Sequence, residues 1–433
     1  VCSSDLPITN IFFIFCPSAN FFSLDFFHKL LITEPTEIGK IGSMFGIYLH
    51  IPFCRRRCNY CDFITYAGKD ELMPGYYAAL MAELQHQATT LQDLPNHVET
   101  IFFGGGTPSL LKVEWIEALI DCVRNEYGLA DEAEISLEAN PGTLAPGFIA
   151  RLLEAGVNRL SIGVQSFIDR DLALLGRIHN SSQASDAILS ARRVGFTNIS
   201  LDLIFGIPGQ SLADWQANLQ KAVALQPDHL SLYSLILEPG TRLYDDVQAG
   251  KIQPISEDLS ADMYELAMDI LAQEGFFHYE ISNWARGETF EAKHNKIYWK
   301  NQSYLGVGVG AHSSLNGLRV ANTPSIEDYI QKMSDLKSDG KGIFPAAVET
   351  IKLDKYTVQQ ETMMLGMRLT REGVSDFEFK NRFGEEIQDV FSNEVKRIIG
   401  RKLAEWRNFP DGPHLVLTRP GALLGNQVFQ EFV

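Results

Sequence analysis

The chain has 433 residues, of which 45% are hydrophobic and 21% charged, enough apolar material for two or three globular domains. Its 54 acidic and 37 basic residues give a net charge of −17, and a field of that sign disfavours a nucleic-acid partner. Six cysteines, three of them clustered, do not form a disulfide framework and are typical of a reducing compartment such as the cytoplasm.

The N-terminal segment, residues 1–43, differs from the rest of the chain. Its apolar run, residues 8–16, is shorter than the roughly 20 residues of a membrane span, and no basic residue precedes it as in a signal peptide. Met44 stands directly before the first clear strand pattern. We therefore expect the native chain to start at Met44 and residues 1–43 to be a non-native extension.

From Met44 onward, runs rich in β-branched residues alternate with amphipathic stretches. The expected strands are 46–51, 98–103, 134–138, 159–163, 198–206 and 229–237. The expected helices between them are 75–92, 112–128, 145–155, 183–195 and 211–226. Six repeats predict an α/β fold with a parallel sheet closed or nearly closed into a partial (β/α)6 TIM-like barrel, and an open doubly wound sheet is the alternative. Gly, Pro and polar residues follow each strand, where a barrel keeps its active site.

The pattern changes after the sixth repeat. A helix is expected at 257–275, and the Gly-rich run 304–313 lies further on. Later helices are expected at 354–370, 376–383 and 387–406, and a hairpin with a short helix at 414–432. The sequence therefore predicts a barrel core over 44–240, an extension over 241–345 and a smaller helical, winged-helix-like domain over 346–433.

Three cysteines, Cys54, Cys58 and Cys61, lie on the loop after the first expected strand. A zinc site normally needs four ligands, and no nearby cysteine or histidine pair completes the set. A redox dithiol would leave Cys54 unexplained, and buried structural cysteines have no reason to share a polar, Arg-rich loop. An iron–sulfur cluster explains both the number and the place, because a [4Fe–4S] cluster held by three thiolates keeps one iron open to a small molecule.

The CxxxCxxC spacing after a first barrel strand resembles the motif of the radical S-adenosylmethionine (SAM) superfamily. The resemblance extends from Met44 to Val433. It implies a [4Fe–4S] cluster whose open iron binds the amino and carboxylate groups of SAM, and a reductive cleavage of SAM that supplies a radical. In such proteins the cofactors carry the chemistry, and the chain supplies position and exclusion of water.

The same resemblance implies a set of SAM-binding positions. Gly105, Gly106 and Thr107 match the stretch that receives the methionine part of SAM, and exposed N–H groups are expected there to donate to its carboxylate. The other positions are Tyr48, Glu138, Gln165, Arg177 and Asp202, with Tyr60 as a lid on the adenine or the cluster. Without the resemblance, the glycine run would be a tight turn, the two carboxylates ion-pair partners, and the rest surface or core residues.

Within the superfamily, the chain is similar to the oxygen-independent coproporphyrinogen III oxidases and to their relatives, the heme chaperones of the HemW type. The oxidase motif continues to a fourth cysteine, at the position where this chain has Phe63. The run 293–299, KHNKIYW, matches the HNxxYW signature proposed to hold heme, so His294 is the expected heme ligand, with His278 and His312 in reserve. A hydrogen-bonded structural histidine is the alternative for His294.

Three arginines, Arg55, Arg56 and Arg57, fill the gap between the first two cysteines. They are interpreted either as solvated charges that balance a negatively charged cluster or as contacts to the carboxylates of a tetrapyrrole, to which arginine binds bidentately.

Three functions compete on this sequence. The first is a chaperone that binds heme and transfers it to an acceptor protein. Its cluster and SAM would serve regulation or an unidentified radical step, and it would contact the membrane at most peripherally. The second is a coproporphyrinogen III oxidase, against which Phe63 counts. The third is a radical SAM enzyme that modifies RNA, which the acidic charge opposes.

Overall fold

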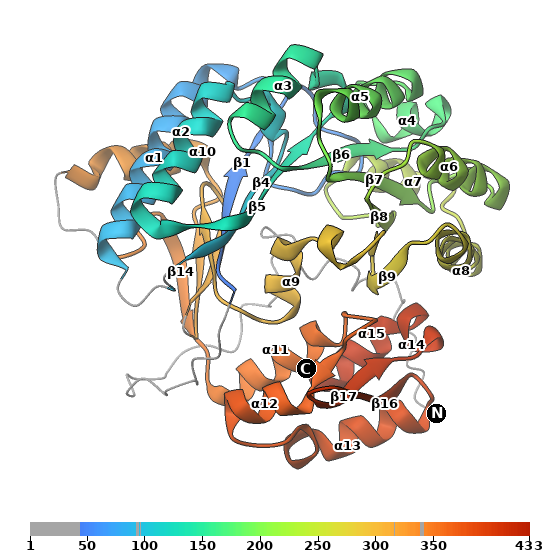
Figure 1. The fold of residues 1–433 in the computed structure, drawn as a ribbon. Coiled ribbons are helices and arrows are strands. Elements are labelled where there is room, and N and C mark those ends of the chain that lie inside the picture. The colour runs from blue at the N-terminus through green and yellow to red at the C-terminus, as the bar shows by residue number, and fades with distance from the viewer. Residues whose placement is uncertain (1–43, 92–94, 96, 316, 338–341) are drawn as a thin grey trace.

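The structure is a computed structural model that describes residues 44–91, 95, 97–315, 317–337 and 342–433. The expectations for residues 1–43 lie outside this part of the chain. Two bodies are visible in Figure 1: a large α/β unit and, below it, a smaller C-terminal unit in orange and red.

Six parallel strands form the centre of the α/β unit, as the sequence predicts. They are β1 (Gly46–Ile51), β4 (Val98–Gly105), β5 (Leu129–Ala139), β6 (Arg159–Gln165), β7 (Ile199–Phe205) and β8 (His229–Ser234). Their order in the sheet is their order in the chain, and each pairs in parallel with the next. A doubly wound sheet would reverse direction at a switch point, so this order excludes that alternative and fits the predicted partial barrel.

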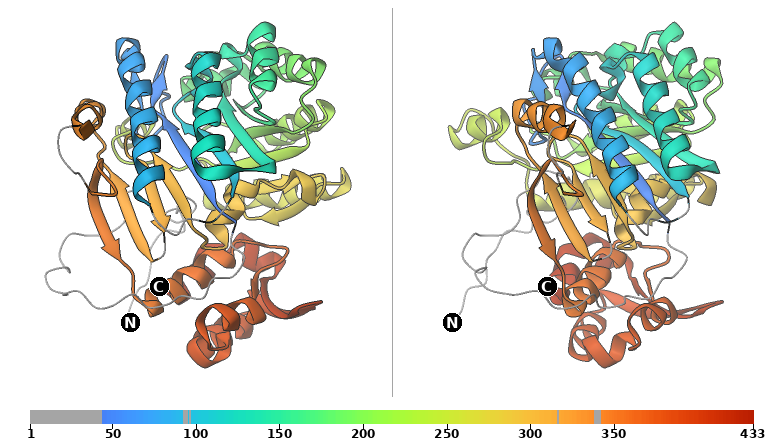
Figure 2. Two further views of the ribbon diagram at one scale, coloured as in Figure 1. Left: turned by 60° about the vertical axis from the view of Figure 1, so that its left-hand side comes forward. Right: turned by 90° about the vertical axis from the view of Figure 1, so that its left-hand side faces the viewer.

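Helices cover one face of these strands (Figure 2). They are α1 (Met73–Thr90), α2 (Val113–Val123), α3 (Pro146–Glu154), α4 (Asp169–Leu175), α5 (Ser181–Val194) and α6 (Leu212–Ala224). Alternate strand residues such as Ile47, Leu137 and Leu201 pack with helix residues such as Leu80 and Trp215 in one hydrophobic core. Because side chains alternate across a strand, the residues in between point to the opposite face, which we call the inner face.

The sheet extends beyond the barrel strands on both sides. Next to β8 lie β10 (Asn283–Ala285) and β9 (Phe277–Glu280), and next to β1 lie β11 (Tyr304–Val307), β12 (His312–Leu315), β13 (Leu318–Asn322) and β14 (Ala347–Lys352). Helices α7 (Arg242–Gln248), α8 (Glu257–Gln273), α9 (Lys293–Trp299) and α10 (Ile326–Ser334) connect these strands. The result is one twelve-stranded mixed sheet with an open edge at each end.

The C-terminal unit has its own hydrophobic core, built around Phe379, Phe391 and Phe432. Its elements are α11 (Lys355–Gly366), β15 (Val374–Ser375), α12 (Asp376–Phe383), α13 (Ile387–Gly400), β16 (Ala404–Phe409), β17 (Gly412–Leu417), α14 (Arg419–Leu423) and α15 (Gly425–Phe429). Three of them form an antiparallel sheet in the order β15-β17-β16. Helices with a small three-stranded sheet agree with the winged-helix-like character predicted for this region.

Two expected boundaries in this unit are wrong. The helix expected at 387–406 ends at Gly400, because Lys402 takes a left-handed φ of 60° that a helix cannot include, and β16 begins at Ala404. The hairpin expected within 414–432 instead pairs β16 with β17, so its first strand is the segment assigned to the helix.

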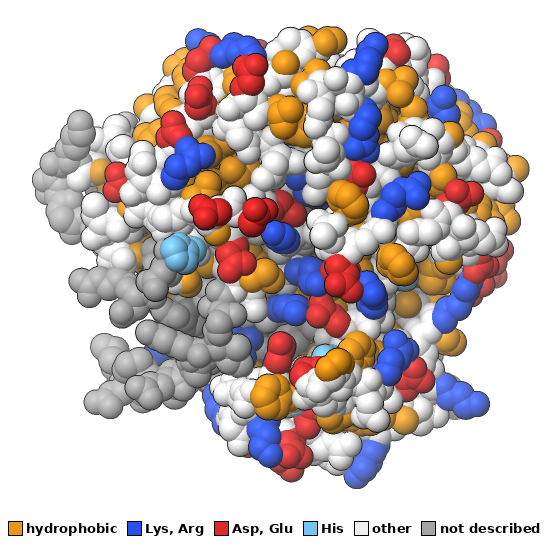
Figure 3. Space-filling model, in the orientation of Figure 1, with side chains coloured by type: hydrophobic (Ala, Val, Ile, Leu, Met, Phe, Trp, Pro, Cys, Tyr) orange, Lys and Arg blue, Asp and Glu red, His pale blue; other side chains and the backbone are white. Residues whose placement is uncertain are grey.

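Charge is mixed on the visible surface. Figure 3 shows Lys and Arg side chains interspersed with Asp and Glu over the face seen in Figure 1. Among the helices of the described residues, none is both long and apolar enough to span a bilayer.

Candidate functional site

The three clustered cysteines lie on a loop whose first and last residues pair with each other as two short strands. β2 (Phe53–Cys54) follows β1 after one residue and pairs with β3 (Tyr66–Ala67), so that Phe53 faces Tyr66 and Cys54 faces Ala67. The loop is therefore anchored at the carboxyl end of the barrel, where the sequence places the active site.

Contacts with the rest of the barrel hold the middle of this loop. The backbone N–H of Asn59 donates to the carbonyl of Leu175 at 2.9 Å, and its side-chain amide donates to that of Leu174 at 2.8 Å. Tyr60 packs on a small cluster of Leu175, Ile204 and Ile207. In this structure Tyr60 is thus part of a packed wall beside the cysteines, and the lid role stays a prediction.

The three thiols are free, and two of them receive hydrogen bonds from the surrounding barrel. Thr107 Oγ1 lies 3.6 Å from Cys54 Sγ, and Arg177 Nη1 lies 3.5 Å from Cys58 Sγ. Burial raises the pKa of the Cys54 thiol, and burial together with the other two sulfurs raises that of Cys61 to about 11. The bare thiolate forms of Cys54 and Cys61 are disfavoured here, so a cationic metal is the natural partner that would deprotonate them.

The spread of these thiols speaks against a single metal ion. Among the described residues, no three Cys, His, Asp or Glu side chains converge closely enough to hold one ion. A zinc site needs that convergence, with sulfurs about 2.3 Å from the metal. A cubane cluster does not need its ligands to converge on one point, because each thiolate binds a different iron.

The arginines between the cysteines point outward. Arg55, Arg56 and Arg57 are exposed, and Arg57 Nε donates to the carbonyl of Cys61 at 3.1 Å. Arg55 also lines a shallow pocket of about 330 Å³ with Lys112 and Arg151. Their exposure agrees with solvated charges, and contact with a tetrapyrrole stays a prediction.

The glycine run after β4 is used differently from what we expected. The N–H of Gly105 donates to Glu138 Oε2 at 3.0 Å, that of Gly106 to the carbonyl of Ile51 at 2.8 Å, and that of Thr107 to the carbonyl of Phe53 at 2.8 Å. The expectation that these N–H groups are exposed for a carboxylate is therefore wrong in this conformation. The run ties β1 and the cysteine loop to β4.

Gly105 must be glycine for two reasons. Its φ is 110°, which side chains with a Cβ rarely adopt. A Cβ there would also lie 2.5 Å from the His50 imidazole. His50 in turn accepts at Nδ1 from the Tyr48 hydroxyl at 3.0 Å and donates from Nε2 to the carbonyl of Ile64 at 2.9 Å, so it links the glycine run, Tyr48 and the far end of the cysteine loop.

Polar side chains line the inner face of all six barrel strands. They are Tyr48, His50, Thr100, Glu134, Ser136, Glu138, Arg159, Ser161, Gln165, Ser200, Asp202, His229, Ser231 and Tyr233. The predicted SAM positions on strands, Tyr48, Glu138, Gln165 and Asp202, all belong to this set. The other members were missed, although a signal was present in several strands: polar residues alternate with apolar ones, as in GIYLHI and HLSLYS.

Two inner-face carboxylates make the centre of the barrel attractive to a cation. Burial and the neighbouring charge of Asp202 raise the pKa of Glu138 to about 7, and burial raises that of Asp202. Ser161 Oγ lies 3.0 Å from Asp202 Oδ1. Arg159 lies close enough to both carboxylates to lower their pKa values, but within the described part of the chain neither carboxylate forms a salt bridge, so a positively charged ligand would further stabilise their ionised forms.

Gln165 and Arg177 lie at the same end of the barrel. Gln165 ends β6 with a φ of 67°, an unusual conformation for a residue other than glycine, and such strain concentrates at functional sites. Arg177 donates to Cys58 Sγ and, at 2.6 Å, to the carbonyl of Gly163. Arg177 therefore links the cysteine loop to β6, and Gln165 lies beside Gly163 on the same strand.

His294 lies at the opposite end of the barrel. Its ring approaches Gly46, the first residue of β1, whereas the cysteine loop follows the last, and five residues of strand span roughly 16 Å. The side chain is 1% exposed, with Nδ1 2.7 Å from Thr100 Oγ1 and Nε2 2.7 Å from the Tyr298 hydroxyl. Neither nitrogen is free for iron in this conformation, so the role of heme ligand stays a prediction that requires these bonds to break.

The replacement His294→Ala tests the structural role of this histidine. We expect the free energy of unfolding to fall by about 2–4 kcal/mol, because a buried ring is lost and two hydroxyls lose their partner. Urea denaturation of the cluster-free chain measures it, and a loss below about 0.5 kcal/mol would contradict the structural role.

Comparison with known proteins shows the family of this chain. Residues 48–222 match the Radical SAM superfamily, and residues 353–424 match the HemN C-terminal domain. The heme chaperone HemW of Bacillus subtilis is 37% identical over 391 residues, which cover 90% of this chain and 99% of that protein. This chain belongs to the HemW family. Membership of the radical SAM superfamily brings with it a [4Fe–4S] cluster and SAM as cofactors.

Other relatives agree with the family assignment. HemW of Lactococcus lactis is 35% identical over 386 residues, 89% of this chain and 96% of that one. The mitochondrial radical S-adenosyl methionine domain-containing protein 1 of mouse is 37% identical over 383 residues, 86% of this chain and 84% of that one. The solved structure of Escherichia coli coproporphyrinogen III oxidase (HemN) has the same fold, with a TM-score of 0.74 over 90% of both chains at 23% identity.

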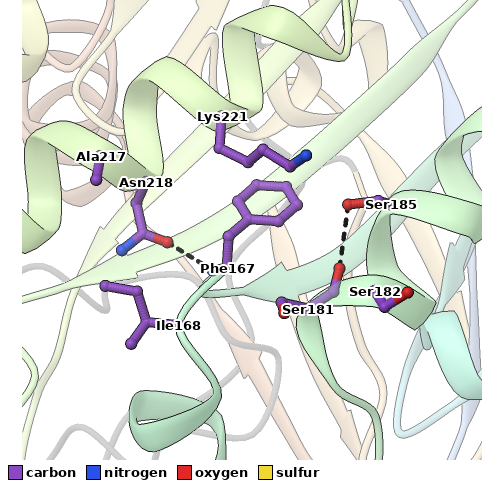
Figure 4. A pocket seen from close by; sticks show the side chains of 8 residues that line it. All are labelled: Phe167, Ile168, Ser181, Ser182, Ser185, Ala217, Asn218 and Lys221. Carbon is purple, nitrogen blue, oxygen red and sulfur yellow. Dashed lines mark hydrogen bonds between the residues drawn. The ribbon is translucent and has the colours of Figure 1, made fainter.

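A second pocket, larger than the one beside Arg55, lies away from the cysteine loop and the inner face. It has a volume of about 400 Å³ and lies between α5 and α6, with Phe167, Asn218 and Lys221 among its lining (Figure 4). Asn218 Oδ1 accepts from the N–H of Phe167 at 2.5 Å, and Ser185 donates to the carbonyl of Ser181 at 3.1 Å. None of the predicted site residues lines this pocket.

Proposed function

We propose that this chain binds heme and transfers it to an acceptor protein, and that it carries a [4Fe–4S] cluster on Cys54, Cys58 and Cys61 with SAM beside it. The observation that carries the proposal is the 37% identity to a HemW heme chaperone over nearly the whole of both chains, joined to the anchored three-thiol loop.

The residues of the loop fit the cluster. Three free thiols lie at the barrel mouth, and Thr107 and Arg177 direct hydrogen bonds at two of the sulfurs. Such bonds stabilise thiolates and tune the potential of a cluster. The cluster would leave one iron open to SAM, and SAM when bound supplies radical chemistry on reductive cleavage.

The inner face fits SAM, which carries a positive sulfonium and, when free, an ammonium group. Glu138 and Asp202 would face these charges, and the strained Gln165 together with Tyr48 would help to position the ligand. Arg177 joins this site to the cluster. The glycine run, whose N–H groups are already bonded, would act through its shape and its lack of side chains.

The affinity for SAM should therefore depend on pH. The pKa of Glu138 is about 7, and a cationic ligand favours the ionised form, so binding should strengthen by about tenfold from pH 6 to pH 8. The variant Glu138→Gln should bind more weakly with a flatter profile. Equilibrium dialysis with labelled SAM on the anaerobically reconstituted chain measures both, and a profile in Glu138→Gln as steep as that of the wild type would contradict the assignment.

We further propose that the chain works in the cytoplasm, because the thiols at Cys54, Cys58 and Cys61 are free and must stay reduced to bind iron.

An assay of oxidase activity separates this function from its main alternative. The reconstituted chain is incubated anaerobically with SAM, a reductant and coproporphyrinogen III, and chromatography follows protoporphyrinogen and 5′-deoxyadenosine. The proposal expects no porphyrin product from a chain with an intact cluster. Formation of protoporphyrinogen in step with SAM cleavage would favour the oxidase and show that Phe63 can replace the fourth cysteine.

A further inference from the structure

A histidine can ligate heme iron only if one of its ring nitrogens is free or easily freed. Three histidines are candidates, and two have engaged rings: His294, as described, and His278, whose Nε2 lies 3.2 Å from the Tyr264 hydroxyl and 3.1 Å from the carbonyl of Ile281. The ring of His278 also stacks on Trp284, with 4.2 Å between centroids. Neither ring can turn toward a ligand without losing these contacts.

His312 differs from both. Within the residues that the structure describes, its ring forms no hydrogen bond, and the side chain is only partly buried. Burial and the nearby charge of Arg319 lower its pKa to about 4, so the imidazole is neutral at physiological pH. A neutral imidazole is the form that binds iron. Arg319 itself is held by Glu361, with nitrogen–oxygen distances of 2.8 and 2.9 Å.

The residues opposite His312 in the sheet have small side chains. In the β11–β12 pair Tyr304 faces Ser314, and two residues further Gly306 lies against the backbone of His312 so closely that a Cβ on it would collide with the His312 carbonyl oxygen. On the other side, β13 places Ala321 opposite His312. Residues opposite each other in a sheet share a face, so the imidazole stands between a glycine and an alanine.

This location belongs to the same surface as the barrel interior. Gly306 is in register with Tyr48 of β1, and Tyr304 is in register with Gly46, so the face that carries His312 continues the inner face of the barrel. The Tyr304 ring contacts that of Tyr298 edge-on, with 4.7 Å between centroids. Two aromatic rings therefore lie on the same face as the imidazole, and Arg319 and His50 lie near enough to it to interact electrostatically.

We propose that His312 is an axial ligand of the heme iron in this protein, on the inner face of the β11–β13 extension. The inference rests on the heme binding proposed above and names the residue through which it occurs. His294 then serves as a structural residue of α9 that stabilises the amino end of the barrel.

The test compares His312→Ala with His294→Ala in the full-length, reconstituted chain. Ferric hemin is titrated into each, with affinity, the Soret spectrum and the electron paramagnetic resonance spectrum as readouts. For His312→Ala we expect the affinity to fall on the order of tenfold or more and the axial histidine signature to disappear, with thermal stability and cluster content unchanged. Added imidazole should restore the spectrum, because it can occupy the space of the missing ring.

The outcomes are distinguishable. A His312→Ala chain with the spectrum of the wild type overturns the assignment while heme binding stands. The assignment is also overturned if His312→Ala loses hemin binding, imidazole does not restore it and the melting temperature falls. His312 then has a structural role. A wild-type chain that binds no hemin overturns both the assignment and the proposed function. His294→Ala is expected to keep the ligand signature despite its lower stability.

Discussion

The variant Cys54→Ala is expected to lose its [4Fe–4S] cluster while the barrel stays folded. Cys54 ends β2 with its thiol 3.6 Å from Thr107 Oγ1, and a chain with two thiols cannot hold a cluster that already lacks a fourth. Iron content and iron–sulfur absorbance after anaerobic reconstitution measure the effect, and circular dichroism reports the fold. We expect roughly four irons per chain in the wild type and close to none in the variant.

Cys122→Ala is the matched control. Cys122 is also free and buried, but it lies on α2 in the hydrophobic core, away from the cysteine loop. The Cys122→Ala variant should therefore assemble a full cluster. Full cluster absorbance in Cys54→Ala would show that the ligand assignment is wrong, and loss of the cluster in both variants would show that assembly responds to general damage instead.

The largest effect on stability is expected at Glu83, which no motif indicates. Its carboxylate on α1 is fully buried and accepts from the N–H of Gly308 at 2.9 Å, from the Tyr329 hydroxyl at 2.6 Å and from the Asn322 amide at 2.8 Å. It thereby ties the first helix to the turn between β11 and β12. Glu83→Ala leaves these donors unsatisfied, so the free energy of unfolding should fall by about 3–5 kcal/mol.

The control for this variant is Glu327→Ala. Glu327 forms an exposed ion pair with Lys69 at 3.1 Å, and a solvent-exposed pair of this kind contributes little to stability. Denaturant titrations of both variants give the comparison. Equal losses in the two would contradict the account of Glu83.

Glu83 should also make stability depend on pH. Burial raises its pKa in the folded chain to about 7, above the value of 4.5 that is usual for glutamate, so the folded state favours the protonated form. The stabilisation that comes from protonating Glu83 in the folded state is fully present below pH 4.5 and is lost as the pH rises through 7. Over this range the free energy of unfolding should fall by on the order of 3 kcal/mol at most. Glu83→Gln, which cannot ionise, should flatten that part of the profile.

The barrel could be predicted from the sequence because its signals are local. Each strand is a short β-branched run next to a turn, and each of the helices α1, α2, α3, α5 and α6 has a periodic apolar face. The strands β12, β13 and β14 have no such signal: β14 is exposed along nearly its whole length, and its pairing with β13 depends on distant contacts. The end of α13 was missed because a left-handed Lys402 cannot be foreseen from residue type.

The site was predictable in part. The spacing of the three cysteines picks out the loop proposed to hold the cluster, and the carboxylates Glu138 and Asp202 stand out within apolar strands. What each N–H or ring nitrogen bonds to depends on residues far away in the sequence. Gly106 is bonded to Ile51, and His294 to Thr100, nearly two hundred residues earlier. The expectations for the glycine run and for His294 therefore could not be checked without the fold.

The most direct test of the central claim is an equilibrium titration of the reconstituted full-length chain with hemin. We predict saturable binding at about one heme per chain, with a spectrum that reports a histidine ligand. We expect this binding because the chain is related to HemW. A linear, non-saturating response, equal to that of a protein without a heme site, would contradict the heme-chaperone function.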